Sequence, residues 1–266
     1  MTQSDRHPSP RGGGAGGEVS SSLLTGQTAL ITGGGTGIGA AAARALAAQG
    51  VRLILAGRRP EPLAQLAAEL SAAQHTSTAP PLTLPADVSD PAQVERLFAQ
   101  ALAAAGRLDL LINAAGVFHM RPLTDTSLDF FDATLNVNLR GAFLCCRAVW
   151  PHFQAHGGGQ IVNIGSVASV EAYPGNAAYG ASKSGLHGLS GVLALEGRPH
   201  NIRLLEVCPG PTDTAIWAGQ APDAVRARML PAAALGHLIA YLLATPRQLA
   251  FDPIIVRNFH NPWSAP

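Results

Sequence analysis

The sequence predicts an α/β fold in one domain, a doubly wound sheet of about seven parallel strands flanked by helices. Short apolar runs alternate along the chain with longer segments rich in Ala and Leu, as strands alternate with helices. Runs such as 110–112 and 161–164 lack regular polar alternation, which is typical of strands buried on both faces. A length of 266 residues, 47% of them hydrophobic, is sufficient for one large core.

Seven segments are expected to form the strands, in the chain order 28–32, 51–56, 82–85, 108–113, 160–164, 202–208 and 253–256. The segments between them are expected to be helices. In open α/β sheets, ligands bind outside the carboxyl ends of the strands. Candidate site residues are therefore expected where strands end, as Gly33, Asn113, Ser166 and Pro209 are.

Residues 1–24 are predicted to form a disordered tail, and residues 25–266 the folded domain. The tail is rich in Gly, Ser and Pro and has too little apolar content to fold. It lacks the apolar core of a secretory signal, and the chain has no run of about eighteen apolar residues. We therefore expect a cytoplasmic protein that is neither secreted nor membrane-spanning.

A glycine-rich turn joins the first expected strand to an Ala-rich helix. Its sequence at 32–39 is TGGGTGIG, the pattern Thr-Gly-x-x-x-Gly-x-Gly. Glycines let the backbone turn tightly and approach a pyrophosphate, and the free N–H groups of a helix start bind its charge. The strand and helix on either side distinguish this turn from an ordinary glycine loop. The pattern predicts a dinucleotide site.

The end of the second strand bears on the choice of dinucleotide. Enzymes that use NAD commonly have an acidic residue there, which binds the ribose 2′-hydroxyl. This chain has Gly57, followed by Arg58 and Arg59. The two guanidinium groups can bind a 2′-phosphate that a carboxylate would repel, so we expect NADP, with NAD possible. Alternatively, both arginines belong to a solvated helix start.

A serine, a tyrosine and a lysine follow the fifth expected strand. Ser166 precedes Tyr179 by thirteen residues, and Lys183 follows Tyr179 by four. Residues four apart share one face of a helix, so the ammonium is expected beside the phenol. A neighbouring positive charge favours the phenolate and lowers the pKa of the tyrosine, which helps it to exchange protons with a substrate. Taken singly, these residues could equally be a turn and a surface cation.

These motifs, in this order, resemble those of the short-chain dehydrogenase/reductase family, in its compact branch with a Rossmann-type fold, over about residues 25–258. The resemblance implies a catalytic tetrad of Asn138, Ser166, Tyr179 and Lys183. It also implies a cofactor site formed by Gly33, Thr36, Gly37, Ile38, Gly39, Arg58, Arg59, Asp87, Val88, Asn113, Ala114, Gly116, Tyr179, Lys183, Pro209, Gly210, Thr212 and Thr214. Thr36 stands where many relatives that prefer NADP carry a basic residue, which keeps NAD possible.

The activity implied by the resemblance is hydride transfer between a nicotinamide and a small or medium alcohol or carbonyl compound. Tyr179 would exchange the proton, and Ser166 would hold the substrate oxygen. Lys183 would lower the pKa of the phenol and bind the nicotinamide ribose, and Asn138 would position a water that relays protons. The alternative is a catalytically silent redox sensor that binds a dinucleotide. Turnover separates the two, and a structural scaffold would need neither motif.

The resemblance also locates the substrate pocket, at His119 and Met120, residues 167–176 and residues 215–221. These segments are mostly apolar. Glu171, Tyr173 and Trp217 could add polar selectivity or an aromatic wall. The loop 214–230 is short, which favours a small or medium carbonyl compound over a steroid.

The segment 250–258 lacks the Val-Asp-Gly-Gly turn that commonly ends the family's chains, and glycines there usually allow close subunit contact. A homodimer or homotetramer is expected, with the dimer formed through the long helices near Asn138 and Tyr179.

Charge and cysteine content argue against other classes of protein. The formal net charge is +1 and only 13% of residues are charged, so we expect no binding to nucleic acid or to a membrane surface. The chain has three cysteines, of which Cys145 and Cys146 are adjacent. They lack metal-ligand spacing and cannot form a disulfide framework, so we expect no metal site and interpret them as small buried hydrophobic residues.

Overall fold

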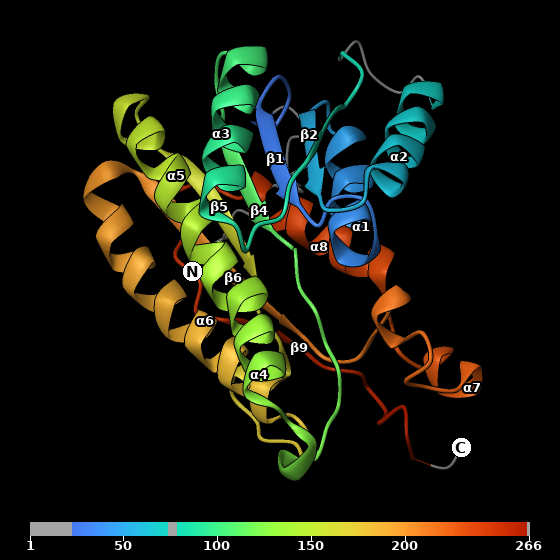
Figure 1. The fold of residues 1–266 in the computed structure, drawn as a ribbon. Coiled ribbons are helices and arrows are strands. Elements are labelled where there is room, and N and C mark those ends of the chain that lie inside the picture. Colours follow the sequence, from blue (N-terminus) through green and yellow to red (C-terminus); the bar gives the residue numbers. More distant parts are fainter. Residues whose placement is uncertain (1–22, 74–78, 265–266) are drawn as a thin grey trace, which may run out of the picture.

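The computed structural model describes residues 23–73 and 79–264, and these form three layers, with one sheet between two layers of helices (Figure 1). The sheet is parallel and has the strand order β3-β2-β1-β4-β5-β6-β9. Its strands are β1 (Thr28–Thr32), β2 (Arg52–Gly57), β3 (Leu82–Pro85), β4 (Leu110–Asn113), β5 (Gly159–Ile164), β6 (Ile202–Pro209) and β9 (Ile254–Val256). The predicted α/β fold with seven parallel strands is confirmed.

Strand bounds differ from the predicted ones by no more than two residues, and the largest difference is at β4. This strand begins at Leu110, although the apolar run begins two residues earlier. The amide of Thr28, at the start of β1, donates to the side-chain carboxylate of Asp109 at 2.9 Å. This amide therefore bonds to a side chain and not to a backbone carbonyl of the neighbouring strand. A second, two-stranded parallel sheet of β7 (Thr212–Asp213) and β8 (Leu230–Pro231) was not predicted, because strands of two residues carry no periodic pattern.

Each face of the main sheet buries its own core. One core packs α1 (Gly37–Ala47), α2 (Pro60–Ala72) and α8 (Ala232–Ala244) against the sheet. The other packs α3 (Pro91–Ala105), α5 (Gly141–Ala155) and α6 (Ala177–Gly197). Helix α4 (Leu128–Leu135) lies against α6, and the short α7 (Asp223–Arg226) projects beside the C-terminal segment (Figure 1). Continuous apolar strands are thus covered on both faces, as predicted.

The folded part includes residues that the sequence assigned to the tail. Leu24 is buried in the core that contains α1 and α8. The rest of the predicted tail, residues 1–22, lies outside the described residues. Within the described part of the chain, no helix is both long enough and apolar enough to cross a membrane.

All three cysteines are free and buried, as predicted for small hydrophobic side chains. Cys145 and Cys146 lie on the buried side of α5, and burial raises the pKa of the Cys146 thiol to about 12. Cys208 lies on β6, where burial and the charge of Glu206 raise its pKa to about 11.

Arg203 is a buried cation that joins β6 to the end of α8. Its guanidinium donates to the backbone oxygens of Leu242 at 3.0 Å, Thr245 at 3.2 Å and Pro246 at 3.0 Å. The side-chain oxygen of Gln160 on β5 accepts from the same group at 3.0 Å. The last carbonyls of a helix lack partners within the helix, so this contact supplies donors that they need.

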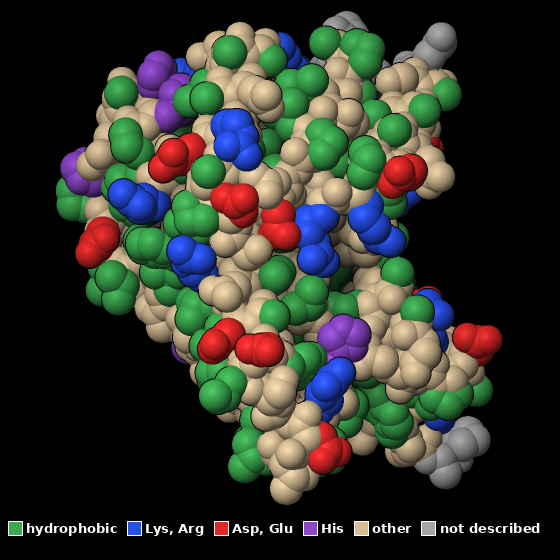
Figure 2. Space-filling view, viewed as in Figure 1, with side chains coloured by type: hydrophobic (Ala, Val, Ile, Leu, Met, Phe, Trp, Pro, Cys, Tyr) green, Lys and Arg blue, Asp and Glu red, His purple; other side chains and the backbone are tan. Residues whose placement is uncertain are grey.

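On the face shown in Figure 2, acidic and basic side chains are interspersed. The surface is hollowed between the main body and the lobe at lower right, where Figure 1 places α7 and the C-terminal segment. The residues that follow several strands gather at this hollow.

Candidate active site

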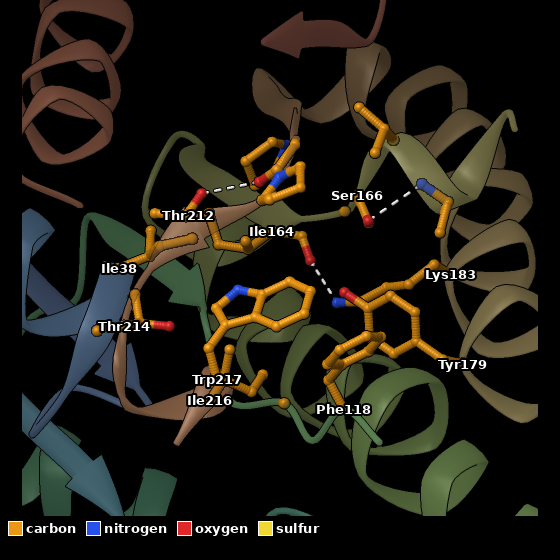
Figure 3. Close-up of a pocket in the computed structure, with 18 of the residues that line it drawn as sticks. Ile38, Phe118, Ile164, Ser166, Tyr179, Lys183, Thr212, Thr214, Ile216 and Trp217 are labelled. Carbon is orange, nitrogen blue, oxygen red and sulfur yellow. Dashed lines mark hydrogen bonds between the residues drawn. The ribbon is translucent and has the colours of Figure 1, made fainter. Parts of the chain in front are cut away.

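The carboxyl ends of β1, β4, β5 and β6 open into one cavity of about 930 Å³. Its lining includes Gly33 after β1, Ala114 after β4, Ser166 after β5 and Gly210 after β6. Side chains from α6 and from the segment after β6 complete the cavity (Figure 3). A topology that places these strand ends at one edge therefore brings sequence-distant residues into one site.

The glycine turn lies at one end of this cavity, and its shape depends on missing side chains. Gly33 has φ +65°, and a Cβ there would lie 2.7 Å from the carbonyl oxygen of Ala114. A Cβ at Gly39 would lie 2.3 Å from the carbonyl oxygen of Gly33. Both positions therefore require glycine for close backbone packing.

Helix α1 begins in this turn at Gly37 with its N-terminus available to a ligand. The preceding Thr36 makes no side-chain capping hydrogen bond, and no acidic residue occupies the first turn. Unpaired N–H groups and the positive end of the helix dipole both favour an anion. The residues present fit the pyrophosphate of a dinucleotide.

A smaller cavity of about 150 Å³ continues from the glycine turn toward the end of β2. Arg58, Arg59, Asp87 and Val88 line it together with Gly57. The side chains of both arginines are exposed to solvent. The Asp87 carboxylate accepts hydrogen bonds from the amide and hydroxyl of Ser89, at 2.9 and 2.7 Å, which fix its orientation. These residues offer two cations and one carboxylate to the adenosine half of a dinucleotide.

Ser166, Tyr179 and Lys183 come together at the centre of the larger cavity (Figure 3). The Lys183 ammonium is buried, donates to the carbonyl oxygen of Ile164 at 2.8 Å and lies 5.7 Å from the centre of the Tyr179 ring. The Ser166 hydroxyl accepts from the amide of Ala168 at 3.1 Å, which caps the turn after β5. The helix and the strand end therefore present the three groups together, as their spacing predicts.

Burial is the main influence on the pKa values of Tyr179 and Lys183. It raises the pKa of Tyr179, although hydrogen bonding with Ser166 acts in the opposite direction. It lowers the pKa of Lys183 to about 8, and the charges of Cys208 and Glu206 oppose that change. The net change in the pKa of the phenol is opposite to the predicted acidification, because removal of the phenol from water outweighs the hydrogen bond with Ser166.

Asn138 is buried in a π-helical turn, Asn136–Arg140, which lies between α4 and α5. Its Oδ1 accepts from the amide of Val117 at 2.8 Å, and its Nδ2 donates to the Val117 carbonyl at 2.9 Å. The same Nδ2 donates to the Ser182 hydroxyl at 3.0 Å, next to Lys183. The side chain thus fixes the segment after β4 against α6 and does not line either cavity.

Two further predicted site residues also lie behind the cavities, Gly39 and Asn113. Gly39 packs against the backbone of the glycine turn, and the Asn113 amide donates to Asn163 Oδ1 at 2.9 Å across β4 and β5. In this structure both residues support the residues that line the site, and their predicted contact with a cofactor stays a prediction. The other predicted residues line at least one cavity: Gly33, Thr36, Gly37, Ile38, Arg58, Arg59, Asp87, Val88, Ala114, Gly116, Ser166, Tyr179, Lys183, Pro209, Gly210, Thr212 and Thr214.

The substrate end of the cavity contains residues that sequence reasoning missed. Of the residues predicted there, Met120, Glu171, Tyr173 and Trp217 line the cavity, whereas His119 does not. Phe118 was missed although it lies only two residues after Gly116. The C-terminal segment was missed because no motif marks it, and it contributes Arg257, Asn258, Asn261, Pro262 and Trp263.

Comparison with known proteins connects this geometry to a family. The sequence model described as short chain dehydrogenase matches residues 27–224. The chain belongs to the short-chain dehydrogenase family.

Two similar members of this short-chain dehydrogenase family are bacterial. The D-threitol dehydrogenase of Mycolicibacterium smegmatis is 37% identical over 214 residues, which cover 78% of this chain and 80% of the relative. The uncharacterized oxidoreductase YxjF of Bacillus subtilis is 33% identical over 223 residues, covering 84% of this chain and 85% of the relative.

Solved short-chain dehydrogenase structures share the fold. A short chain dehydrogenase from Burkholderia cenocepacia J2315, in complex with NADP, is 33% identical, with a TM-score of 0.79, covering 89% of this chain and 98% of that chain. An alcohol dehydrogenase from Thermococcus sibiricus, complexed with 5-hydroxy-NADP, is 25% identical with a TM-score of 0.81. The match covers 90% of this chain and 98% of that chain.

Proposed function

We propose that this short-chain dehydrogenase is an oxidoreductase dependent on NAD(P), with NADP favoured, that interconverts an alcohol and a carbonyl compound. One observation carries the proposal. Ser166, Tyr179 and Lys183 lie in the same cavity as a glycine turn that fits a pyrophosphate. Proton-transfer groups and a dinucleotide site in one cavity are what such a reaction needs.

The cofactor site is assigned to the glycine turn, the residues of the smaller cavity and those after β4 and β6. A nicotinamide dinucleotide, when bound, supplies or accepts the hydride. Gly57, Arg58 and Arg59 support NADP, because the end of β2 has two cations for a 2′-phosphate and no carboxylate, and the carboxylate of the smaller cavity, Asp87, follows β3. Two structural neighbours crystallised with NADP or 5-hydroxy-NADP add support for a cofactor of this class.

The catalytic roles are assigned to three side chains. Because its pKa is raised, Tyr179 is protonated near neutral pH, and its phenol donates a proton to the carbonyl oxygen during reduction. The Ser166 hydroxyl holds that oxygen, and the Lys183 ammonium stabilises the resulting phenolate by its charge. In oxidation, Tyr179 accepts the proton from the alcohol. Asn138 acts as a positioning residue through Val117 and Ser182.

The first test measures turnover. The loss of near-ultraviolet absorbance of NADPH and NADH is recorded with a panel of aldehydes and ketones. We expect Tyr179→Phe to abolish turnover and to retain dinucleotide binding, measured by isothermal titration. Tyr241→Phe is the matched control, because Tyr241 is exposed on α8, away from the cavity. Substantial activity of the Tyr179→Phe protein contradicts the proposed role, and tight binding without wild-type turnover favours the redox sensor.

We also propose a homodimer formed through α5 and α6. Phe143, Val192 and Leu195 on these helices are large apolar side chains with exposed fractions of 43%, 53% and 60%. Exposed apolar groups on long helices favour self-association. Light scattering after gel filtration tests this, and Leu195→Glu should shift the mass toward the monomer.

A further inference from the structure

The outer part of the cavity has an aromatic wall, which we define as Phe118, Trp217 and Trp263. The Phe118 ring contacts the Tyr179 ring edge-on, with centroids 4.7 Å apart. Trp217 lies 4.8 Å from Phe118, and Trp263 lies 5.4 Å from Trp217. The wall therefore runs without a break from the reacting phenol outward, and Figure 3 shows its first two rings beside Tyr179.

The wall is backed by packed side chains that hold it in place. Phe118 and Trp217 are buried in a small apolar cluster with Met229, and Val225 of α7 packs against that cluster. Trp263 is about half exposed, at 47%, and forms the outer end. Met120, Val167 and Ile216 add further apolar lining.

Trp263 belongs to the C-terminal segment, and several polar contacts hold this segment across the cavity. Arg257 forms an ion pair with Glu171, in the loop after β5. The Arg228 guanidinium donates to the carbonyl oxygen of Ser264 at 2.6 Å, and the Asn258 amide donates to the carbonyl oxygen of Arg228 at 3.2 Å. These contacts lie on both sides of Trp263 in the sequence, so its ring is held at the cavity.

Gln220 and Glu171, two polar side chains of the outer cavity, already have hydrogen-bond partners within the protein. Gln220 donates to the carbonyl oxygens of Phe118 at 3.0 Å and Ile216 at 2.7 Å, and accepts from the Met120 amide at 3.4 Å. Glu171 accepts from the Tyr173 hydroxyl at 2.5 Å in addition to its pairing with Arg257.

Three asparagine residues also line the cavity. Asn261 Oδ1 accepts from the Trp263 amide at 3.0 Å. The Oδ1 atoms of Asn176 and Asn258 have no partner among the described residues, but both are buried by protein and are not presented to a ligand.

This arrangement separates two classes of substrate. A polyol or sugar would bring several hydroxyl groups to a wall beside which the side chains of Gln220 and Glu171 already have partners, and a buried hydroxyl without a partner weakens binding. An apolar ring would stack edge-on or offset against Phe118, Trp217 and Trp263 and would remove their surface from water. Only the reacting oxygen would then need polar partners, which Ser166 and Tyr179 supply.

We propose that the outer cavity selects a carbonyl or alcohol substrate whose substituent is an aryl or cycloalkyl ring, against polyols and sugars. This substrate class rests on the proposed oxidoreductase function. It differs from the substrate in the name of the relative from Mycolicibacterium smegmatis, D-threitol dehydrogenase.

The kinetic test compares four ketones with NADPH: acetophenone, cyclohexyl methyl ketone, butanone and erythrulose. We expect kcat/KM for the two ring-bearing ketones to exceed that for erythrulose by about tenfold or more. Trp263→Ala should lower kcat/KM for these ketones several-fold through KM, with little effect on butanone. Phe259→Ala is the matched control, because Phe259 is an exposed aromatic residue of the same segment that does not line the cavity.

Two kinetic outcomes overturn the inference. One is turnover of erythrulose equal to or faster than that of acetophenone. The other is an equal effect of Trp263→Ala and Phe259→Ala on the ring-bearing ketones.

A binding measurement separates failure of this inference from failure of the proposed function. Acetophenone and erythrulose are titrated into the Tyr179→Phe protein with NADP present, and tryptophan fluorescence reports occupancy near Trp217 and Trp263. If acetophenone binds more tightly than erythrulose but the wild-type protein shows no turnover, the preference of the cavity for a ring is supported and the proposed oxidoreductase function is contradicted. Erythrulose binding as tight as that of acetophenone, or no binding of acetophenone, overturns the preference itself.

Discussion

The ammonium of Lys183 donates a 2.8 Å hydrogen bond to the carbonyl oxygen of Ile164, the last residue of β5. This bond joins α6 to the strand that ends just before Ser166. It therefore fixes the distance between Tyr179, which precedes Lys183 by one helical turn, and Ser166. A charged group buried at this position is sensitive to pH, because its pKa has fallen to about 8.

The first prediction concerns the pH dependence of carbonyl reduction. A lysine whose pKa is lowered to about 8 is cationic below that pH and loses its charge as the pH rises through it. The rate should therefore decline above about pH 8. Since the pKa of Tyr179 is raised, the phenol keeps its proton and does not cause this decline. A pH profile of kcat/KM checks it, and a flat profile through this range contradicts it.

The second prediction concerns Glu206, a buried carboxylate on β6 that lies 2.8 Å from the His187 ring nitrogen. Its charge raises the pKa of Lys183 against the effect of burial. Glu206→Gln keeps the size but removes the charge, so the decline in kcat/KM should begin at a lower pH. Glu196→Gln is the control, an exposed change on α6. Equal pH profiles for the two variants would show that Glu206 does not influence Lys183.

The third prediction concerns the selection of the cofactor at the end of β2. Replacing both Arg58 and Arg59 with alanine removes two cations from the smaller cavity. KM for NADPH should rise about tenfold or more, since charge-assisted hydrogen bonds to phosphate are strong. KM for NADH should change little, and it serves as the internal control. A parallel rise in both constants would place the arginines outside the recognition of the 2′-phosphate.

The fourth prediction concerns the close packing of the glycine turn. A Cβ at Gly39 would lie 2.3 Å from the Gly33 carbonyl oxygen, so Gly39→Ala must displace backbone. We expect a loss of about 1–3 kcal/mol in the free energy of unfolding and weaker NADPH binding. Chemical denaturation and isothermal titration measure the two effects. Gly191→Ala on α6, where no atom lies within 4 Å of the added carbon, should be neutral or stabilising.

The fifth prediction concerns Arg203 at the end of α8. Arg203→Met removes the guanidinium donors to the carbonyl oxygen of Thr245 and to Gln160 Oε1, whereas the carbonyl oxygens of Leu242 and Pro246 keep other donors. The cost is about 3 kcal/mol in the free energy of unfolding, because buried polar groups without partners are costly. Urea denaturation checks it, with Arg147→Met on the exposed side of α5 as the control. A similar stability of both variants would mean that the contact contributes little.

Local sequence patterns predicted the order of elements and most residues of the cavity. Strand runs such as 28–32 are buried on both faces, and their apolar character shows this directly. The glycine turn and the spacing of Tyr179 and Lys183 are short-range patterns, so the backbone geometry that they require can be predicted from neighbours in the chain.

Burial and long-range packing could not be predicted in the same way. The spacing of Tyr179 and Lys183 predicts an acidic phenol, but the pKa of Tyr179 is raised because the fold removes it from water. The sequence places Asn138 in a catalytic set, and only the fold shows that its side chain is hydrogen bonded to the backbone of Val117.

By itself, the sequence determined the α/β architecture, the glycine turn and the Ser166, Tyr179 and Lys183 group. These features follow from periodicity and from residue types that neighbouring residues constrain. Only the tertiary structure decided that Trp263 joins Phe118 and Trp217 in one wall. Their contact depends on how the segments after β4, β6 and β9 pack together once the sheet has formed, and no local pattern encodes a distance between segments so far apart.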